Sequence, residues 1–333
     1  MFAKIIKIIL ALFTVIIVLF AFWFCLEFYL PAKNGPKEIL LEIKRGQKVA
    51  DIAQALKKNH IIRKKWPFLI GYKIFYSTQT LNAGEYKFQF PLSSKQALKT
   101  IIQGKIYLHP LTIPEGLTLK EIARYLESFH LVTEKDFIEA ASNPHQIEGW
   151  DKNAFNLEGY LFPDTYHFPK GVTASQIVKA MVSQFKKTFN QQMKTRADQL
   201  GMTVRQVVIL ASLIEKETSI PEEKNLIAAV FHNRLRRGMK LDCDPTIIYA
   251  LKQEERFTGR LRWKDLKLNS PYNTYLYPGL PPSPICNPGL GSLQAALYPV
   301  EENFLYFVSK NDGSHYFSRS LKEHLRAVRK YQK

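Results

Sequence analysis

The chain has 333 residues, of which 46% are hydrophobic and 13% are aromatic, and its formal net charge is +18. This composition is typical of a folded protein with two or three domains, and it excludes a disordered chain. The basic excess predicts an anionic partner, although solvated surface lysines alone would give the same excess. Since no nucleic-acid-binding module is present, we expect a membrane surface or an acidic polymer and no nucleic acid.

The N-terminal segment predicts a membrane-spanning helix. Residues 8–26 contain no charged side chain, and 19 helical residues at ~1.5 Å each nearly span a ~30 Å hydrocarbon core. Lys4 and Lys7 precede this run and Glu27 follows it, so the positive-inside rule places the N-terminus in the cytoplasm and the body outside. A cleaved signal peptide is the alternative, but the bulky residues 22–24 leave no small-residue cleavage site. We therefore expect a single-pass anchor.

A repeated pattern follows a predicted linker at residues 31–37. Residues 43–62 recur at residues 113–132, and each copy predicts a strand, a glycine turn and an amphipathic helix. We infer a duplicated strand–helix unit, in which the paired histidines are helix-end residues rather than ligands. The matched pairs are Ile43 and Ile113, Gly46 and Gly116, Ile52 and Ile122, Leu56 and Leu126, and His60 and His130.

The first copy resembles a glycan-binding module. Its pattern G-x-x-x-x-x-I-A-x-x-L, from Gly46 to Leu56, is similar to that of LysM-like modules, which in other proteins bind cell-wall glycans that contain N-acetylglucosamine. The resemblance implies a LysM-like module at residues 38–108. Short αβ units with this spacing are common, so the spacing alone does not establish glycan binding.

The most informative stretch is QVVILASLIEKET, at residues 206–218. Thr203 predicts a helix N-cap, and apolar side chains cover nearly the whole circumference of the helix that follows. Glu215 and Glu217 each continue one of its apolar rows. Burial disfavours the charged form of a carboxyl, so we expect a pKa raised towards the range of a general acid. The alternative is that both glutamates are solvated at a helix end.

The C-terminal half predicts helices and a substrate-binding loop. A helix should run from Pro221 to Gly238, and Asp244-Pro245-Thr246 should cap a short helix that carries Tyr249. Residues 270–291 form a long loop rich in proline, glycine and tyrosine, and such loops are usually functional. Its predicted substrate contacts are Tyr272, Tyr275 and Tyr277, which would stack on sugar rings, and Asn273, which would form hydrogen bonds.

Several kinds of enzyme are excluded by missing motifs. The chain has no H-E-x-x-H sequence and no G-x-S-x-G sequence, so a zinc peptidase and a serine hydrolase are not expected. No cysteine spacing predicts a metal site, and we expect no metal and no cofactor. The sequence leaves open whether Cys243 and Cys286 are free or paired.

An ordered set of motifs resembles one known family. The motifs EGYLFPDTY, LASLIEKET, VFHNRL, DPTIIYA, SPYNTYLYPGLPPSPICNPG and YFVSKNDGSHYFS follow one another behind a single N-terminal anchor. Together they resemble the endolytic murein transglycosylase family (YceG-like, MltG) over essentially the whole chain. The resemblance implies that Glu217, the second glutamate of E-K-E-T, is catalytic and that Glu215 has a supporting role. The substrate-binding candidates are Glu215, Asp244, Thr246, Tyr249, Tyr272, Asn273 and Tyr275.

The resemblance also implies a reaction and a location. The expected substrate is the β-1,4 bond between N-acetylmuramic acid and N-acetylglucosamine in nascent peptidoglycan, and the product carries a 1,6-anhydromuramyl end that terminates the strand. The expected location is the bacterial inner membrane, with the body extracytoplasmic and with peptidoglycan synthases as further candidate partners. A non-catalytic, membrane-tethered scaffold that binds glycan is the alternative.

The predicted fold class is α+β. We expect a cytoplasmic tip and a transmembrane helix at residues 1–30, the linker at 31–37, the LysM-like module at 38–108 and a mixed α/β catalytic region at 109–333.

Overall fold

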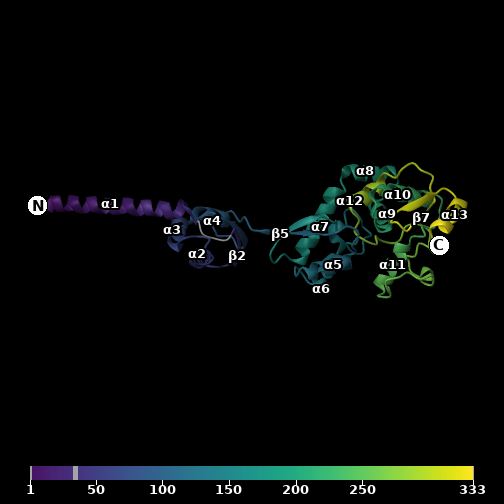
Figure 1. Cartoon of the computed structure of the whole chain (residues 1–333), viewed down its shortest axis with the longest axis horizontal. Helices are drawn as coiled ribbons and strands as arrows, with labels where there is room; N and C mark the ends of the chain where they lie inside the picture. Colours follow the sequence, from purple (N-terminus) through teal and green to yellow (C-terminus); the bar gives the residue numbers. More distant parts are fainter. Residues whose placement is uncertain (1, 33–36, 333) are drawn as a thin grey trace. The chain divides into compact units, whose positions relative to one another are not determined.

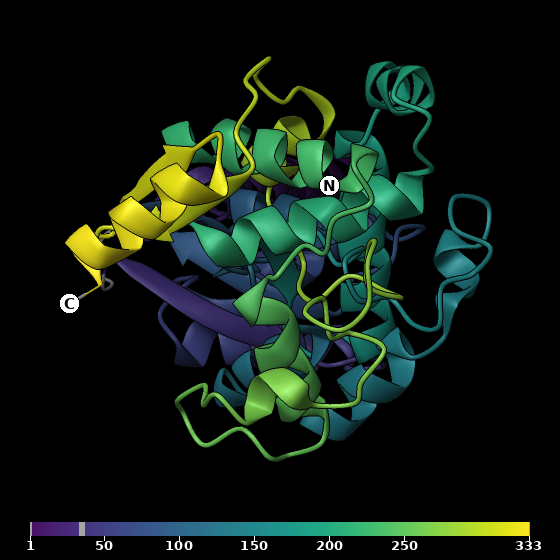
Figure 2. The ribbon, with the colours of Figure 1, turned by 90° about the vertical axis from the view of Figure 1, so that its right-hand side faces the viewer.

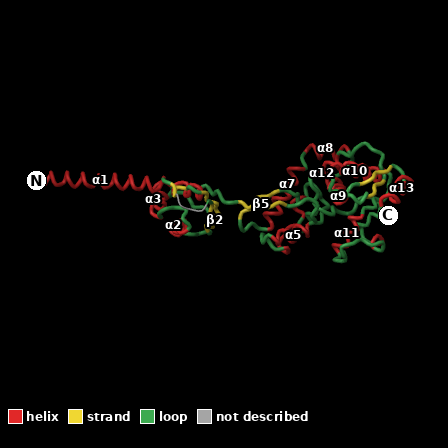
Figure 3. Tube along the Cα trace, in the orientation of Figure 1, coloured by secondary structure: helices red, strands yellow, loops and turns green. Residues whose placement is uncertain are grey.

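The computed structural model describes residues 2–32 and 37–332, which form two compact units (Figures 1 and 3). The first unit comprises the chain up to residue 109 together with residues 167–170, and the second comprises residues 110–166 and the chain from residue 171 onward. Helices predominate, and the strands described form two-stranded sheets, so the predicted mixed α+β class is confirmed. Residues 33–36 of the predicted linker lie outside the described residues.

The first unit consists of four helices and short antiparallel strand pairs within its described residues. Strand β2 pairs with β3, with Ile43 opposite Gly84, and β1 pairs with β4. The helices pack on the β2–β3 pair through a core that includes Leu56, Phe68 and Tyr86. The elements are α1 (Phe2–Tyr29), β1 (Pro31–Ala32), β2 (Glu38–Ile43), α2 (Val49–Lys58), α3 (Lys65–Phe75), β3 (Gly84–Gln89), β4 (Leu92–Ser93) and α4 (Ser94–Ile102).

Helix α1 contains the predicted membrane span. It is 28 residues long and is apolar enough to cross a membrane. Its side chains are exposed over most of its length, whereas Phe24 and Phe28 near its end are buried in the core of the first unit. The end of the helix is therefore part of a folded unit, while the charge-free run before it has no protein partner among the described residues.

The second unit is mainly helical, and a C-terminal hairpin and helix complete it. Figure 2 shows this yellow hairpin and helix beside the green helices, and β7 contacts both α10 and α13. The elements from residue 108 onward are β5 (Leu108–Thr112), α5 (Leu119–Ser128), α6 (Glu134–Ala141), a 3₁₀ turn (Pro144–Ile147), β6 (Thr165–Pro169), α7 (Ala174–Thr188), α8 (Gln191–Gln199), α9 (Val204–Glu217), α10 (Pro221–Arg236), α11 (Asp244–Gln253), a 3₁₀ turn (Asp265–Lys267), α12 (Leu290–Leu297), β7 (Tyr306–Ser309), β8 (His315–Ser318) and α13 (Leu321–Tyr331).

The predicted duplication is confirmed by the order of elements. Apart from the short strand β4 in the first series and a 3₁₀ turn in the second, the series β2, α2, α3, β3, α4 recurs as β5, α5, α6, β6, α7. In each series the two strands pair with each other. Gly46 and Gly116 occupy the turn after the first strand with φ of 79° and 77°, which favour glycine. His60 and His130 follow the next helix with φ of 58° and 54°. The two histidines are thus helix-end residues, as the repeat predicts.

Helix α9 is the centre of the second unit. It contacts α8, α10, α11 and α12, and every residue from 207 to 214 is buried. The side chain of Thr203 accepts a hydrogen bond from the backbone N–H of Gln206, and the Gln206 side chain accepts one from the backbone N–H of Thr203. This capping box confirms the predicted start of the helix and satisfies two donors that would otherwise lack partners.

A glycine substitution tests the packing beside α9. Gly159 has φ of 87°, and a Cβ built there would lie 2.5 Å from Pro284 Cγ and 2.9 Å from Val208 Cγ1. Gly171 has a similar φ of 75° with no atom within 4 Å of the same position. We predict that Gly159→Ala lowers the free energy of unfolding by about 3 kcal/mol or more, and that Gly171→Ala, which adds only backbone strain, lowers it by about 1 kcal/mol. Urea unfolding of the detergent-solubilised chain measures both, and equal losses would contradict the packing described.

Candidate active site

Glu217 is the last residue of α9, and its side chain is half-buried. The pKa of Glu217 is raised to about 7, first by burial among protein atoms and then by the nearby charge of Asp244. The Cys243 thiol, which donates a hydrogen bond to the carboxylate, and the Arg234 guanidinium oppose that rise. The result is a carboxyl that is accessible to solvent and that takes up and releases a proton near neutral pH.

Arg234 fixes the segment that supplies Cys243 and Asp244. Its guanidinium is buried and donates hydrogen bonds to the backbone carbonyls of Lys240 and Leu241, both at 3.0 Å, and to that of Leu305 at 2.7 Å. It also forms an ion pair with Asp242 at 2.8 Å. One side chain of α10 therefore joins the segment before α11 to the segment before β7.

Thr218, the residue after Glu217, is linked through Glu223 to the C-terminal β7–β8 hairpin. The Thr218 hydroxyl donates to Glu223 Oε2 at 3.3 Å. The backbone N–H of His315, on β8, donates to Glu223 Oε1 at 2.8 Å, and His315 Nδ1 lies 2.7 Å from Glu223 Oε2. The segments on both sides of Glu217 thus depend on contacts with residues much further along the chain, because Arg234 and Leu305 are 71 positions apart and Glu223 and His315 are 92 positions apart.

Asp244 begins α11 but does not cap it as predicted. The N-cap is Cys243, and its side chain makes no capping hydrogen bond. The Asp244 carboxylate instead accepts a hydrogen bond from the Tyr275 hydroxyl at 2.5 Å. The Thr246 hydroxyl donates to the carbonyl of Cys243 at 2.7 Å, within the first turn of α11.

Two predicted substrate contacts lie inside the protein. Thr246 and Asn273 are fully buried. The Asn273 amide donates to the carbonyls of Leu266 and Leu268 at 3.0 and 2.7 Å, and its oxygen accepts from the backbone N–H of Tyr275 at 2.9 Å. These bonds hold the long loop in shape and leave the Asn273 side chain engaged with backbone groups.

Glu215 lies in a separate polar cluster. Its carboxylate forms an ion pair with Lys224 at 3.2 Å and accepts hydrogen bonds from the Ser292 hydroxyl at 2.6 Å and the backbone N–H of Gly289 at 3.1 Å. Lys224 also lies 3.8 Å from Glu115. Burial and the charge of Glu215 raise the pKa of Glu115. Glu215 therefore joins α9 to α10 and to the start of α12.

A third carboxyl, Glu158, is buried beside two of the predicted tyrosines. It accepts hydrogen bonds from the backbone N–H of Leu119 at 2.9 Å and from the Asn287 side chain at 3.0 Å. The Tyr249 hydroxyl lies 3.4 Å from its other oxygen, and the Tyr249 ring packs on Tyr272 with centroids 5.0 Å apart. Burial raises the pKa of Glu158 to about 8.

The structure thus divides the predicted site residues into three groups. Glu217, Asp244, Thr246 and Tyr275 lie around Cys243, and Asn273 holds the backbone of Tyr275. Tyr249 and Tyr272 lie beside Glu158, and Glu215 pairs with Lys224. Sequence reasoning did not select Cys243, Arg234, Lys224 or Glu158 as site residues. The only available signal was that Glu158 heads the EGYLFPDTY motif and that Arg234 lies in VFHNRL.

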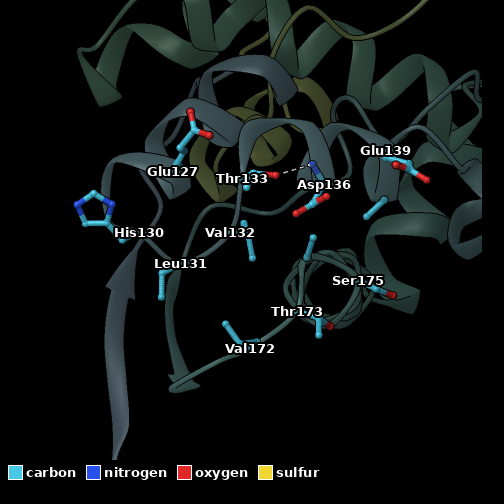
Figure 4. A pocket seen from close by; sticks show the side chains of 12 residues that line it. Glu127, His130, Leu131, Val132, Thr133, Asp136, Glu139, Val172, Thr173 and Ser175 are labelled. Atoms are coloured by element: carbon cyan, nitrogen blue, oxygen red, sulfur yellow. Dashed lines mark hydrogen bonds between the residues drawn. The ribbon is translucent and has the colours of Figure 1, made fainter.

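The cavity in Figure 4 lies elsewhere in the second unit. It has a volume of about 870 Å³ and is formed by the α5–α6 connection, α6 and the start of α7. Neither Glu217 nor any other candidate site residue lines it. Among residues 2–32 and 37–332, no group of three His, Cys, Asp or Glu side chains is placed to hold a metal ion.

A solvent-accessible carboxyl with a pKa near neutrality is typical of enzymes that use general acid–base catalysis. The profile of the family described as YceG-like matches residues 41–330. The endolytic murein transglycosylase of Bacillus subtilis is 33% identical over 324 residues, covering 90% of this chain and 86% of the relative. That of Streptococcus pneumoniae serotype 2 is 30% identical over 341 aligned positions, covering 93% of this chain and 61% of the relative.

A solved structure supports membership of the same family. The crystal structure of a YceG-like protein from Listeria monocytogenes matches with a TM-score of 0.60 and 33% identity, covering 87% of this chain and 98% of that chain. The chain belongs to the YceG-like family.

The pKa of Glu158 predicts a pH-dependent stability. Because the folded state keeps its proton up to about pH 8 and the unfolded state loses it near 4.5, folding is weakened as the pH rises between these values. We predict that the free energy of unfolding falls across this window and that Glu158→Gln reduces the slope by up to about 1.4 kcal/mol per pH unit. Urea unfolding between pH 5 and 8 measures this. Glu148→Gln, at an exposed carboxyl, is the control, and a Glu158→Gln slope equal to that of the control would contradict the prediction.

Proposed function

We propose that this chain is a membrane-anchored endolytic murein transglycosylase. It cleaves the β-1,4 bond between N-acetylmuramic acid and N-acetylglucosamine in nascent glycan strands and leaves 1,6-anhydromuramyl ends. The observation that carries this proposal is the half-buried Glu217 with a pKa near 7, in a chain whose family relatives bear this enzyme name.

A single carboxyl suffices because the substrate supplies the nucleophile. Protonated Glu217 donates its proton to the glycosidic oxygen as the bond from C1 of muramic acid breaks. The 6-hydroxyl of the same sugar then bonds to C1, and its proton passes to the Glu217 carboxylate, which restores the acid. Most glycoside hydrolases use a second carboxylate to activate water or to attack the sugar, and this reaction does not need one. A pKa near 7 suits both proton transfers.

The exposure of each candidate side chain indicates whether it can contact the sugar. Asp244 is exposed and Tyr272 and Tyr275 are half-buried, so we assign substrate contact to these three. Thr246, Tyr249 and Asn273 are buried, and Glu215 is engaged by Lys224 and Ser292. We assign these four to positioning the helices and the loop around the site.

The remaining sequence supplies the location of the enzyme. We assign residues 1–30 to a cytoplasmic tip and an inner-membrane anchor, with an extracytoplasmic body, and residues 109–333 to catalysis. The glycine turn and helix of residues 38–108 support a LysM-like module for the glycan. Peptidoglycan synthases, which make the nascent strands, are the proposed protein partners.

Replacing Glu217 tests the assignment. We predict that Glu217→Gln lowers the rate of glycan cleavage by about 10²–10⁴-fold, because the amide keeps the shape of the side chain and cannot donate and recover a proton. Mass analysis of products from purified glycan strands measures the rate and detects anhydro ends. Glu222→Gln, at an exposed carboxyl at the start of α10, should cleave at the unaltered rate.

Three outcomes would contradict the proposal in different ways. Activity in Glu217→Gln together with loss in Glu215→Gln would exchange the roles of the two glutamates. Reducing ends in place of anhydro ends would indicate hydrolysis. A folded wild-type chain that binds strands and never cuts them would indicate a scaffold.

The pH profile provides a second test. Since Glu217 must be protonated to act as the acid, kcat/KM should fall as the pH rises above about 7. The charge of Asp244 raises the pKa of Glu217, so Asp244→Asn should move this alkaline limb to lower pH in addition to any loss of rate. Initial rates between pH 5 and 9 measure the shift, and an unmoved limb would mean that another group limits the rate.

A further inference from the structure

Helix α3 is apolar on two faces. Phe68 and Gly71 face the core of the first unit and are buried. Trp66 and Ile74 are 60% and 61% exposed, although they recur at helical spacing with the half-buried Leu69. A helix that is apolar all round requires an apolar partner on its outer face as well. Among the described residues, no element covers that face.

The inner face of α3 is fixed to the end of α1. A Cβ built at Gly71 would lie 2.3 Å from Phe28 Cε2, so the two helices meet at the closest distance that glycine allows. The Phe28 ring is also stacked on Phe75, with centroids 5.9 Å apart. Because Phe28 is 1% exposed, this contact belongs to the core of the unit. The end of the predicted membrane helix is therefore packed against α3 within this core.

Both ends of α3 lie next to residues 23–27 of α1. Next to the start of α3, Lys64 Nζ lies 5.7 Å from the centre of the Trp23 ring and forms an ion pair with Glu27 at 3.0 Å. At its other end, the Phe75 ring lies 6.4 Å from that of Phe24. The charge-free run of α1 ends at residue 26. Helix α3 thus crosses α1 at the end of the span, on the side of the first unit from which α1 projects (Figure 1).

The charges around α3 are basic. Arg63, Lys64 and Lys73 are exposed, and Lys65 Nζ lies over the Trp66 ring at 5.3 Å from its centre. The one acidic side chain described at this junction is Glu27, which is buried and paired with Arg63 and Lys64. Aromatic and aliphatic side chains flanked by lysines are typical of helices that lie in a lipid headgroup layer.

We propose that the outer face of α3 is a lipid-binding surface that lies in the headgroup layer of the bilayer crossed by α1. Trp66 and Ile74 enter the boundary with the acyl chains, and Lys65 and Lys73 attract the headgroups of anionic lipids. The proposal rests on the membrane anchoring proposed above. The occupant is lipid because α3 is fixed to α1 at the level where the span ends, so the bilayer itself meets this face. The first unit is then held on the membrane in one orientation.

The test measures the depth of Trp66 in full-length chain reconstituted into vesicles. In a variant with Trp23, Trp150 and Trp263 replaced by phenylalanine, we expect phospholipids brominated on the upper acyl carbons to quench Trp66 fluorescence by about twofold or more, and aqueous iodide to quench it little. The matched control replaces Trp66 by phenylalanine as well and carries Leu40→Trp. Leu40 lies on β2 of the same unit and is 48% exposed, so its tryptophan should show the opposite pattern.

Lipid composition tests the role of the lysines. Each lysine near an anionic surface favours the membrane-bound position of α3 over the unbound one by about fivefold. Quenching should therefore be stronger in vesicles with anionic phospholipid than in zwitterionic vesicles, and Lys65→Glu with Lys73→Glu should remove that difference. Equal quenching in both kinds of vesicle by the unaltered chain would refute the proposed attraction of these lysines to anionic lipid.

The remaining outcomes separate this proposal from the anchoring on which it rests. If Trp66 is as open to iodide as the Leu40→Trp control while the chain floats with the vesicles after a high-salt wash, the surface proposed for α3 is refuted and the anchor stands. If the high-salt wash releases the chain from the vesicles, the anchor is refuted first.

Discussion

The burial of α9 is the constraint on which the second unit depends. Eight consecutive residues of this helix, 207–214, are buried, and four other helices contact it. Its C-terminal end therefore cannot move without disturbing the core, and Glu217 is placed where protein atoms displace most of the surrounding water. The raised pKa of Glu217 follows from this placement first and from Asp244 second. The Glu217 side chain nevertheless remains half-exposed, whereas the carboxyl of Glu158 is buried in the core.

Local signals predicted much of the fold. The capping box at Thr203, the helical period of α9 and the repeated glycine turns all lie within a few residues of the features that they determine, so one sequence suffices to find them. The pattern also indicated that the carboxyl of Glu217 would have apolar neighbours. It did not predict that Cys243 would replace Asp244 as the cap of α11, because the carboxylate of Asp244 is engaged by Tyr275, 31 residues away.

Long-range contacts explain what the sequence could not predict. Asn287 reaches Glu158 across 129 residues, and Arg234 reaches the carbonyl of Leu305 across 71. Neither contact has a periodic pattern, and each depends on how separate elements pack. For the same reason, the three groups of site residues around Glu217, Glu158 and Glu215 were not separable in the sequence, although they lie on or beside the same buried helix.

The surroundings of Glu217 depend on the C-terminal hairpin. Through Leu305 it holds Arg234, and through His315 and Glu223 it holds Thr218, the neighbour of Glu217. Residues 305–318, which carry none of the proposed chemistry, thus hold the neighbours of Glu217 in place. Because these residues are synthesised after Glu217, the site is complete only when the hairpin has been made, and a chain that stopped before residue 305 would carry Glu217 without these contacts.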